Sequence, residues 1–191
     1  MLEYYYIEEN KKQKMNDINY IFVFGTLMRK YSSTSMLAKG GKAFASKVKD
    51  VAIHGYSLYG ICGSFIFPMI KKGDGSVRGE LWRLTDVANY RSILLDRLDR
   101  YENVAGGLYN RGTIEIDGQE AYIYEYTGEI DDNTFKIQSN DWITFCNKNK
   151  ELIEDYNDTM IGYNFENPDD PDNKSIIKKI TPIINKIKRN S

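Results

Sequence analysis

The feature that most limits how this chain can fold is a long stretch of strand-like sequence that ends where a helical repeat begins. Residues 42–84 are rich in β-branched and aromatic types and are divided by glycines. This pattern predicts strands over residues 43–51, 54–59, 65–71 and 76–84. The segment Gly73-Asp74-Gly75 is predicted to form the hairpin loop between the last two strands.

The hydrophobic period changes after residue 84, where apolar side chains recur at helical spacing. The repeat predicts an amphipathic helix of about four turns. Thr85 or Asp86 is the predicted cap, and the helix ends near Glu102. The apolar positions of this helix are Val87, Tyr90, Ile93, Leu94, Leu98 and Tyr101.

Local signals place the remaining elements. Residues 18–24 form an apolar run that predicts a buried strand ending at Gly25. Asp117-Gly118 predicts a tight hairpin between strands 109–116 and 121–126. A short helix capped within residues 32–35 reaches Lys39, and another begins near residues 139–141. Together these elements predict an α+β fold, with a mixed, mostly closed, barrel-like sheet and a few flanking helices.

A length of 191 residues fits one domain with appendages better than two full cores. We expect an N-terminal arm over residues 1–17, a main domain over 18–150 and a partly helical extension over 151–191. The extension carries six isoleucines between positions 176 and 187, interrupted by Pro182. Such an apolar stripe is expected to pack on the barrel or on a second subunit, since exposure to water would be unfavourable.

Charge and hydropathy exclude some function classes. The chain has 26 basic and 27 acidic side chains, a formal net charge of -1, so the clustered positive charge of a nucleic-acid binder is missing. No apolar run approaches the roughly 18 residues of a membrane span, and the acidic N-terminal sequence does not resemble a signal peptide. The expectation is a cytoplasmic protein that binds neither nucleic acid nor membranes.

Few residues are available for metal or nucleophilic chemistry. His54 is the sole histidine, and Cys62 and Cys146 belong to no CxxC pair. A metal site, a disulfide framework and a serine–histidine triad are therefore not expected. Acid–base chemistry would fall to carboxylates, lysines or tyrosines.

Two segments are candidates for a functional site, and each has a plain structural alternative. Gly25 follows a buried strand, so residues 25–28 could expose backbone amides that bind an anion, or could form an ordinary turn. Glu102 closes the predicted helix, where a carboxylate opposes the helix dipole. It could serve a function there, or could be a solvated surface charge.

Taken together, several ordered motifs resemble the gamma-glutamylcyclotransferase-like superfamily, which includes gamma-glutamylamine cyclotransferases and plant avirulence-induced proteins. The resemblance covers residues 19 to about 148. The matching segments are Phe24-Gly25-Thr26-Leu27, Pro68, Gly73-Asp74-Gly75, Val77-Arg78-Gly79-Glu80-Leu81-Trp82, Leu98-Asp99-Arg100-Tyr101-Glu102, Tyr109-Asn110-Arg111 and Ser139-Asn140-Asp141-Trp142. Phe24 stands where the family has tyrosine, and the 103–107 spacer is longer than in the amine-acting members.

The resemblance implies a cofactor-independent enzyme whose substrate is a small L-gamma-glutamyl compound. The α-amine would attack the γ-carbonyl, releasing 5-oxoproline and an amine or amino acid whose identity the sequence does not specify. Glu102 would be the catalytic acid/base, and residues 18–150 the catalytic domain. Substrate would be bound by Phe24, Gly25, Thr26, Leu27 and Tyr109, while Arg111 would tie strand to helix. A homodimer is one option, and a non-catalytic binding or interaction module on the same fold is the alternative function.

Overall fold

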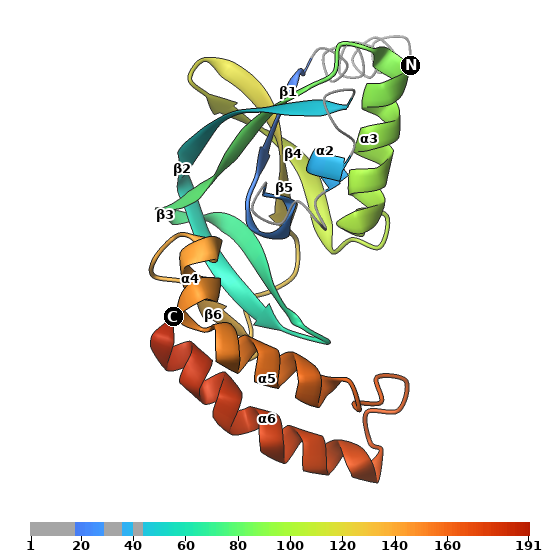
Figure 1. Cartoon of the computed structure of the whole chain (residues 1–191), viewed down its shortest axis with the longest axis vertical. Helices are drawn as coiled ribbons and strands as arrows, with labels where there is room; N and C mark the ends of the chain where they lie inside the picture. The colour runs from blue at the N-terminus through green and yellow to red at the C-terminus, as the bar shows by residue number, and fades with distance from the viewer. Residues whose placement is uncertain (1–17, 29–35, 40–43) are drawn as a thin grey trace, which may run out of the picture.

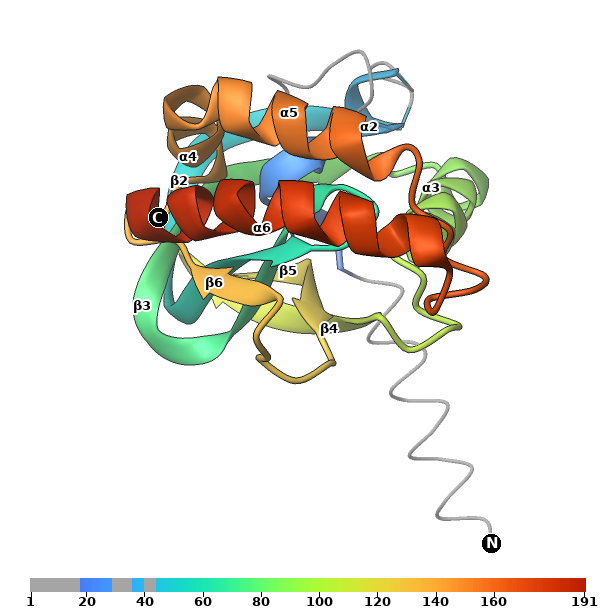
Figure 2. The ribbon, with the colours of Figure 1, turned by 90° about the horizontal axis from the view of Figure 1, so that it is seen from below.

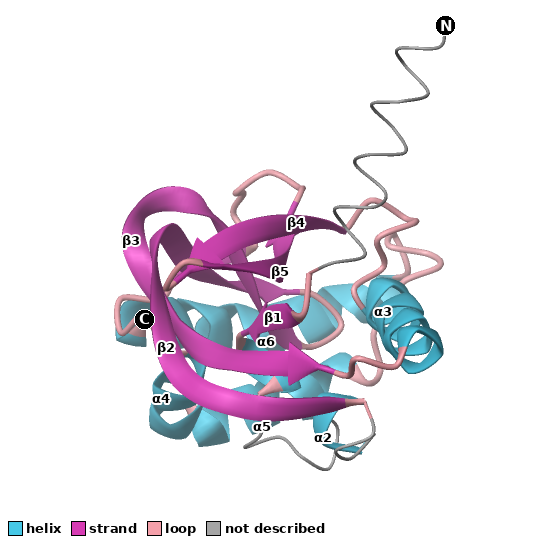
Figure 3. Ribbon diagram, turned by 90° about the horizontal axis from the view of Figure 1, so that it is seen from above, coloured by secondary structure: helices cyan, strands magenta, loops and turns pink. Residues whose placement is uncertain are grey.

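The computed structural model describes residues 18–28, 36–39 and 44–191, and it shows a curled, six-stranded sheet with helices at one side and one end (Figures 1 and 3). The strand order is β4-β5-β1-β3-β2-β6. β1 runs parallel to β5, and its other neighbour, β3, is antiparallel. The predicted α+β class and curled sheet are confirmed. In chain order the elements are β1 (Tyr20–Val23), the 3-10 helix η1 (Gly25–Leu27), α2 (Met36–Lys39), β2 (Ala45–Cys62), β3 (Ile66–Leu84), α3 (Ala88–Tyr101), β4 (Tyr109–Ile116), β5 (Gln119–Tyr126), β6 (Thr134–Lys136), α4 (Trp142–Lys148), α5 (Lys150–Met160) and α6 (Pro171–Asn190).

β1 lies in the middle of the sheet and is buried on both faces. Ile21 and Val23 pack in the cluster that contains the buried leucines of α3. Phe22 points to the opposite face and packs in the cluster that contains side chains of α4, α5 and α6. A strand covered on both faces needs a continuous apolar run. This explains why apolar and polar side chains do not alternate along β1.

β2 and β3 form one long antiparallel pair, so the predicted division into four strands is wrong. The turn that joins them lies near Gly63, and the predicted hairpin at Gly73-Asp74-Gly75 lies inside β3. A register shift between His54 and Tyr56 faces this glycine segment. A Cβ at Gly73 would lie 2.7 Å from Oγ of Ser57. The glycines therefore permit close approach where the strands bend.

Two local predictions are confirmed in the second half of the chain. Asp117 and Gly118 have φ values of 52° and 76° and join β4 to β5 as a tight hairpin. Asp141 is the N-cap of α4, and its carboxylate accepts the amide of Ile143 at 2.9 Å. Both features depend on short-range chemistry.

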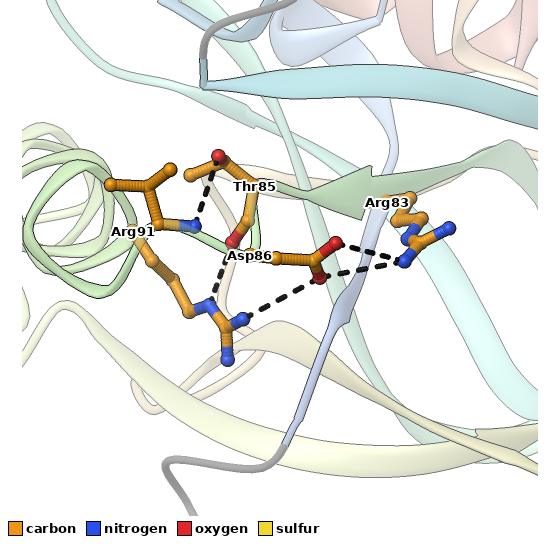
Figure 4. A network of polar contacts seen from close by, with 5 residues as sticks. Arg83, Thr85, Asp86 and Arg91 are labelled. Carbon is orange, nitrogen blue, oxygen red and sulfur yellow. Dashed lines mark hydrogen bonds and ion pairs between the residues drawn. The ribbon is translucent and has the colours of Figure 1, made fainter.

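α3 begins later than predicted and without a side-chain N-cap. Its N-cap residue is Val87, whose amide donates to Oγ1 of Thr85 at 3.3 Å. Figure 4 shows how the approach to the helix is held: Asp86 lies between Arg83 and Arg91, with its carboxylate 3.0 Å from Nη2 of Arg83. Nε of Arg91 also donates to the carbonyl of Thr85. Thr85 and Asp86 thus organise the segment before α3 instead of capping it.

The buried face of α3 is narrower than the predicted apolar stripe. Leu94, Leu95 and Leu98 are buried against the sheet. The remaining predicted positions, Val87, Tyr90, Ile93 and Tyr101, are exposed. Tyr90 contacts the ring of Phe44, with ring centroids 5.3 Å apart, so part of the exposed surface packs laterally.

α5 and α6 lie side by side and cover one end of the sheet (Figure 2). Ile180 and Ile187 of α6 are buried in the same cluster as Phe22 of β1. Most of the isoleucine stripe therefore packs within this chain, in agreement with the first of its two predicted options, packing on the barrel, whereas Ile177 is 44% exposed. The division at residue 150 and a homodimer stay predictions. Residues 1–17, including the predicted arm, and the predicted cap at 32–35 lie outside the described residues.

Candidate active site

A pocket of about 310 Å³ opens where β1 passes into η1. Its other walls come from the end of α3, the beginning of β4, one residue of β5, the turn between β2 and β3, and the first residues of β3. The lining residues are Phe22, Val23, Phe24, Thr26, Leu27, Ser64, Phe65, Phe67, Pro68, Tyr101, Glu102, Leu108, Tyr109 and Tyr124. The walls are mostly aromatic and aliphatic. Glu102 is the one residue with a carboxyl side chain among these lining residues.

Gly25 makes the turn from β1 into the pocket wall. Its φ is +71°, a left-handed conformation that glycine adopts without strain. A Cβ at this position would overlap the ring of Pro68. Phe24, the N-cap of η1, supplies no side-chain hydrogen bond to the first turn. The positive φ of Gly25 therefore sets the direction in which η1 leaves β1.

Gly25→Ala is expected to lower the free energy of unfolding by about 1–3 kcal/mol, because it combines left-handed strain with a clash against Pro68. The matched control is Gly118→Ala, where φ is +76° but no atom lies within 4 Å of the added Cβ. Urea unfolding should show a larger loss for Gly25→Ala. Equal losses would mean that Pro68 moves aside without cost.

The end of α3 places Glu102 at the pocket. Glu102 is the C-cap, and Asn103 follows with a φ of +50°. The amide of Asn103 donates to the backbone carbonyl of Arg100 at 3.2 Å, and the amide of Val104 donates to the backbone carbonyl of Asp99 at 2.9 Å. These two bonds form a Schellman motif, in which asparagine takes the left-handed position that glycine often fills. The chain reversal fixes the backbone of Glu102.

Burial dominates the electrostatics of Glu102. It raises the pKa of this carboxyl from 4.5 to about 7. Within the described part of the chain, no hydrogen bond or ion pair joins the carboxylate to another side chain. Tyr109 lies close enough that, after burial, the Glu102 charge is the next cause of its raised pKa. Glu102 retains some exposed surface toward the pocket, so a small molecule can reach it.

The raised pKa makes stability depend on pH. A carboxyl whose folded pKa exceeds its unfolded value stabilises the protein most below the unfolded pKa, and this contribution is lost as pH rises through the folded pKa. Between pH 4.5 and 7 the loss amounts to about 3 kcal/mol, from 1.36 kcal/mol per pKa unit. Glu102→Gln removes the titration. Its stability relative to wild type is therefore expected to rise by about this amount between pH 4 and 8.

Urea unfolding of both proteins at several pH values measures this difference. Glu115→Gln, an exposed position on β4, is the matched control for the loss of a carboxylate. A stability difference for Glu102→Gln that stayed constant with pH would mean that Glu102 titrates normally.

Polar side chains behind the pocket hold its walls together. The hydroxyl of Tyr124 donates to Asp99 at 2.7 Å, and Nη1 of Arg111 lies 3.3 Å from the other carboxylate oxygen of Asp99. The guanidinium also lies over the ring of Tyr122, 5.0 Å from its centroid. Arg111 thus joins β4 to α3, as the sequence predicted.

The structure brings together most of the residues that the sequence singled out. Phe24, Thr26, Leu27, Glu102 and Tyr109 all line the one pocket. Gly25 does not line this pocket, but it makes the turn from β1 into η1. The hydroxyl of Tyr109 already donates to the carbonyl of Pro68 at 2.9 Å. The roles of these residues toward a substrate stay predictions.

Sequence reasoning missed several lining residues. Tyr124 could have been found from the alternation along β5, which places Tyr122 and Tyr124 on the face toward α3. Pro68 was singled out only as part of a matching family motif, yet it lines the pocket and packs on Gly25. Phe65 carried no signal beyond strand propensity, and Phe67 stood only beside Pro68 in the segment that resembles the family.

The other candidate groups lie away from the pocket. His54 is exposed on β2, and neither Cys62 nor Cys146 lines the pocket. Over residues 18–28, 36–39 and 44–191, no group of three or more histidine, cysteine, aspartate or glutamate side chains could hold a metal ion. No helix in these ranges is both long enough and apolar enough to span a membrane.

Known structures share this architecture. An uncharacterized protein from Pyrococcus horikoshii is 20% identical with a TM-score of 0.51, and the match covers 70% of this chain and 97% of that one. Protein ytfP from Escherichia coli is 28% identical with a TM-score of 0.48, over 65% of this chain and 96% of that one. A structure named gamma-glutamyl cyclotransferase is 16% identical with a TM-score of 0.45, over 84% and 98%. No curated protein sequence matches significantly.

The fold and the pocket define a small α+β protein in which one half-buried carboxyl, that of Glu102, faces a mostly apolar cavity. The model of the family described as gamma-glutamyl cyclotransferase, AIG2-like, matches residues 21–144, which is more than half of the chain. The chain belongs to this family, so the predicted family resemblance is confirmed. The matched region contains η1, Glu102 and the other pocket residues.

Proposed function

We propose that the chain is a gamma-glutamylcyclotransferase-type enzyme that releases 5-oxoproline from an L-gamma-glutamyl substrate. The observation that supports this most is Glu102, a buried carboxyl with a pKa of about 7 that faces a pocket large enough for a small molecule. Family membership supports the reaction type. Leu27 and the other η1 residues would hold the substrate α-carboxylate through backbone amides.

In the proposed reaction the α-amine attacks the γ-carbonyl carbon of the same molecule. A carbon–nitrogen bond forms to close the five-membered ring, and the bond to the leaving nitrogen breaks. Glu102 takes the proton that the attacking α-ammonium loses and gives one to the leaving nitrogen. Because the two reacting groups are already tethered, the enzyme mainly has to hold the ring-closing conformer.

The raised pKa of Glu102 suits this proton transfer. An α-ammonium has a pKa near 8, so transfer to an ordinary glutamate of pKa about 4.3 would cost roughly 5 kcal/mol. With the pKa of Glu102 at about 7, the gap falls to about 1.4 kcal/mol. Burial among apolar walls thus makes the carboxyl a competent base near neutral pH while it remains able to act as an acid.

Purified full-length protein incubated with γ-glutamyl amides, γ-glutamyl dipeptides and glutathione tests the proposal. The expected result is 5-oxoproline from at least one class, with kcat/KM rising as Glu102 ionises near pH 7. Binding of these compounds without any 5-oxoproline would contradict the proposal and would favour the non-catalytic module. Glutathione and the dipeptides distinguish amino-acid from amine leaving groups.

A further inference from the structure

The turn between β2 and β3 forms part of the pocket wall and is short. β2 ends at Cys62 and β3 begins at Ile66. Ser64 and Phe65, within the turn, both line the pocket. Both side chains are exposed, so burial does little to hold them in place. Contacts that reach the turn from other elements therefore matter for the position of this wall.

Tyr156 of α5 supplies such a contact, and Figure 1 shows the β2–β3 turn directed toward this helix. The side chain is 1% exposed, and its hydroxyl donates to the carbonyl of Gly63 at 2.7 Å, across 93 residues of sequence. Gly63 directly precedes Ser64, the first pocket residue of the turn. The ring of Tyr156 belongs to the same buried cluster as Ile66, where β3 begins. The hydrogen bond thus holds the point at which the chain enters the turn.

α6 reaches the same turn through one loop. The amide of Cys62 donates to the carbonyl of Asn133 at 2.9 Å. The carbonyl of the preceding residue, Asp132, accepts a hydrogen bond from Nζ of Lys188 on α6. Both α5 and α6 lie beyond residues 21–144, the part of the chain that the family model matches. One wall of the pocket is therefore held by helices outside the matched region.

We propose that Tyr156 is a positioning residue whose hydroxyl holds the β2–β3 wall in the place where a gamma-glutamyl substrate binds. This role rests on the proposed function, because it concerns the same pocket. The proton-transfer group lies on another element: Glu102 ends α3, and its backbone is fixed by the amides of Asn103 and Val104. Removing the hydroxyl of Tyr156 should therefore weaken substrate binding and leave the chemical step largely unchanged.

Tyr156→Phe in the full-length protein tests this role, because phenylalanine keeps the buried ring and removes only the hydroxyl. The substrate is whichever γ-glutamyl amide, γ-glutamyl dipeptide or glutathione the wild type turns over. KM is expected to rise about 3- to 10-fold, the effect of one lost hydrogen bond, while kcat stays within about twofold. The pH midpoint of kcat/KM should stay near 7, since Glu102 sets it. Hydrogen exchange at the backbone amides of residues 62–66 should become faster.

Tyr56→Phe is the matched control. Tyr56 is 6% exposed and does not line the pocket, and its hydroxyl donates to Glu125 at 2.9 Å. Each variant loses one hydrogen bond made by a buried tyrosine, and urea unfolding verifies that both are folded. Only Tyr156→Phe should raise KM.

The outcomes separate this role from the proposed function. An unchanged KM in Tyr156→Phe, or an equal rise in both variants, would overturn the positioning role and leave the cyclotransferase activity standing. Unchanged hydrogen exchange at residues 62–66, or a loss confined to kcat, would also overturn it, because the hydroxyl would then not act through the position of the wall. If the wild type released no 5-oxoproline from any compound tested, the proposed function would fall and the inference with it.

Discussion

Glu102→Gln is expected to lower kcat by about 10²- to 10⁴-fold, the range found when a general acid–base group is removed. Glutamine keeps the shape of the side chain but cannot accept the proton of the α-ammonium. The backbone of residue 102 is fixed by the Schellman bonds of Asn103 and Val104, which do not involve the side chain. The variant should therefore fold normally and still bind substrate.

Steady-state release of 5-oxoproline measures kcat, and calorimetry with an unreacted substrate amide measures binding by the variant. Glu115→Gln removes a carboxylate from an exposed position on β4 and should keep wild-type kcat. Near wild-type kcat in Glu102→Gln would mean that another group moves the proton. It would also favour the alternative interpretation, in which Glu102 is only a surface charge at the end of a helix.

Glu102→Asp tests whether the position of the carboxyl matters as well as its presence. The shorter side chain retains a carboxyl but withdraws it by one methylene from the reacting nitrogen. A partial loss of kcat, smaller than for glutamine, is the result that a proton-transfer role predicts. Equal losses for both variants would instead indicate that position matters more than the proton.

The residues of the site could be predicted where a single local rule fixed them. Gly25 follows an apolar strand and takes the positive φ that such a turn requires. Glu102 was singled out because a carboxylate at the end of a helix opposes the dipole. Neither argument by itself favoured a function over a turn or a surface charge. The structure adds the fact that both elements face one pocket.

The walls of the pocket could not be predicted in the same way. Phe65 reaches the site from the β2–β3 turn, Pro68 from the start of β3, and Tyr124 from β5, which is far from both in the sequence. Their convergence depends on the curl of the sheet, which no local pattern encodes. Tyr124 alone had a usable signal, because alternation along a strand fixes which side chains share a face.

The fold shows the same division between local and long-range causes. The Asp117-Gly118 turn and the Asp141 cap act within a few residues, and the predicted hairpin and the predicted helix start near residues 139–141 are both confirmed. Gly73 was misassigned because a glycine that permits a turn and one that permits close packing look alike in sequence. Only the partner strand, with Ser57 against Gly73, distinguishes them.

Ile187→Ala is expected to lower the free energy of unfolding by about 2–5 kcal/mol, as large-to-small changes in a well-packed core do. Ile187 is completely buried, and it belongs to the same cluster as Phe22 in the middle of the sheet. α6 thus completes a core that reaches β1, the first strand of the sheet, and five more strands separate β1 from the C-terminal helices in the sequence. Loss of this side chain should therefore destabilise the whole protein, not the C-terminal helices alone.

Ile177→Ala provides the control, because Ile177 lies on the same helix but is 44% exposed. Its substitution should change the free energy of unfolding by no more than about 0.5 kcal/mol. Urea unfolding followed by both tryptophan fluorescence and circular dichroism measures both variants. Coincident transitions in Ile187→Ala would show that the C-terminal helices unfold together with the sheet. If the two isoleucine variants were equally stable, or if the transitions separated, residues 151–191 would be an extension that contributes little to the main core, and the boundary predicted at residue 150 would mark an independent unit.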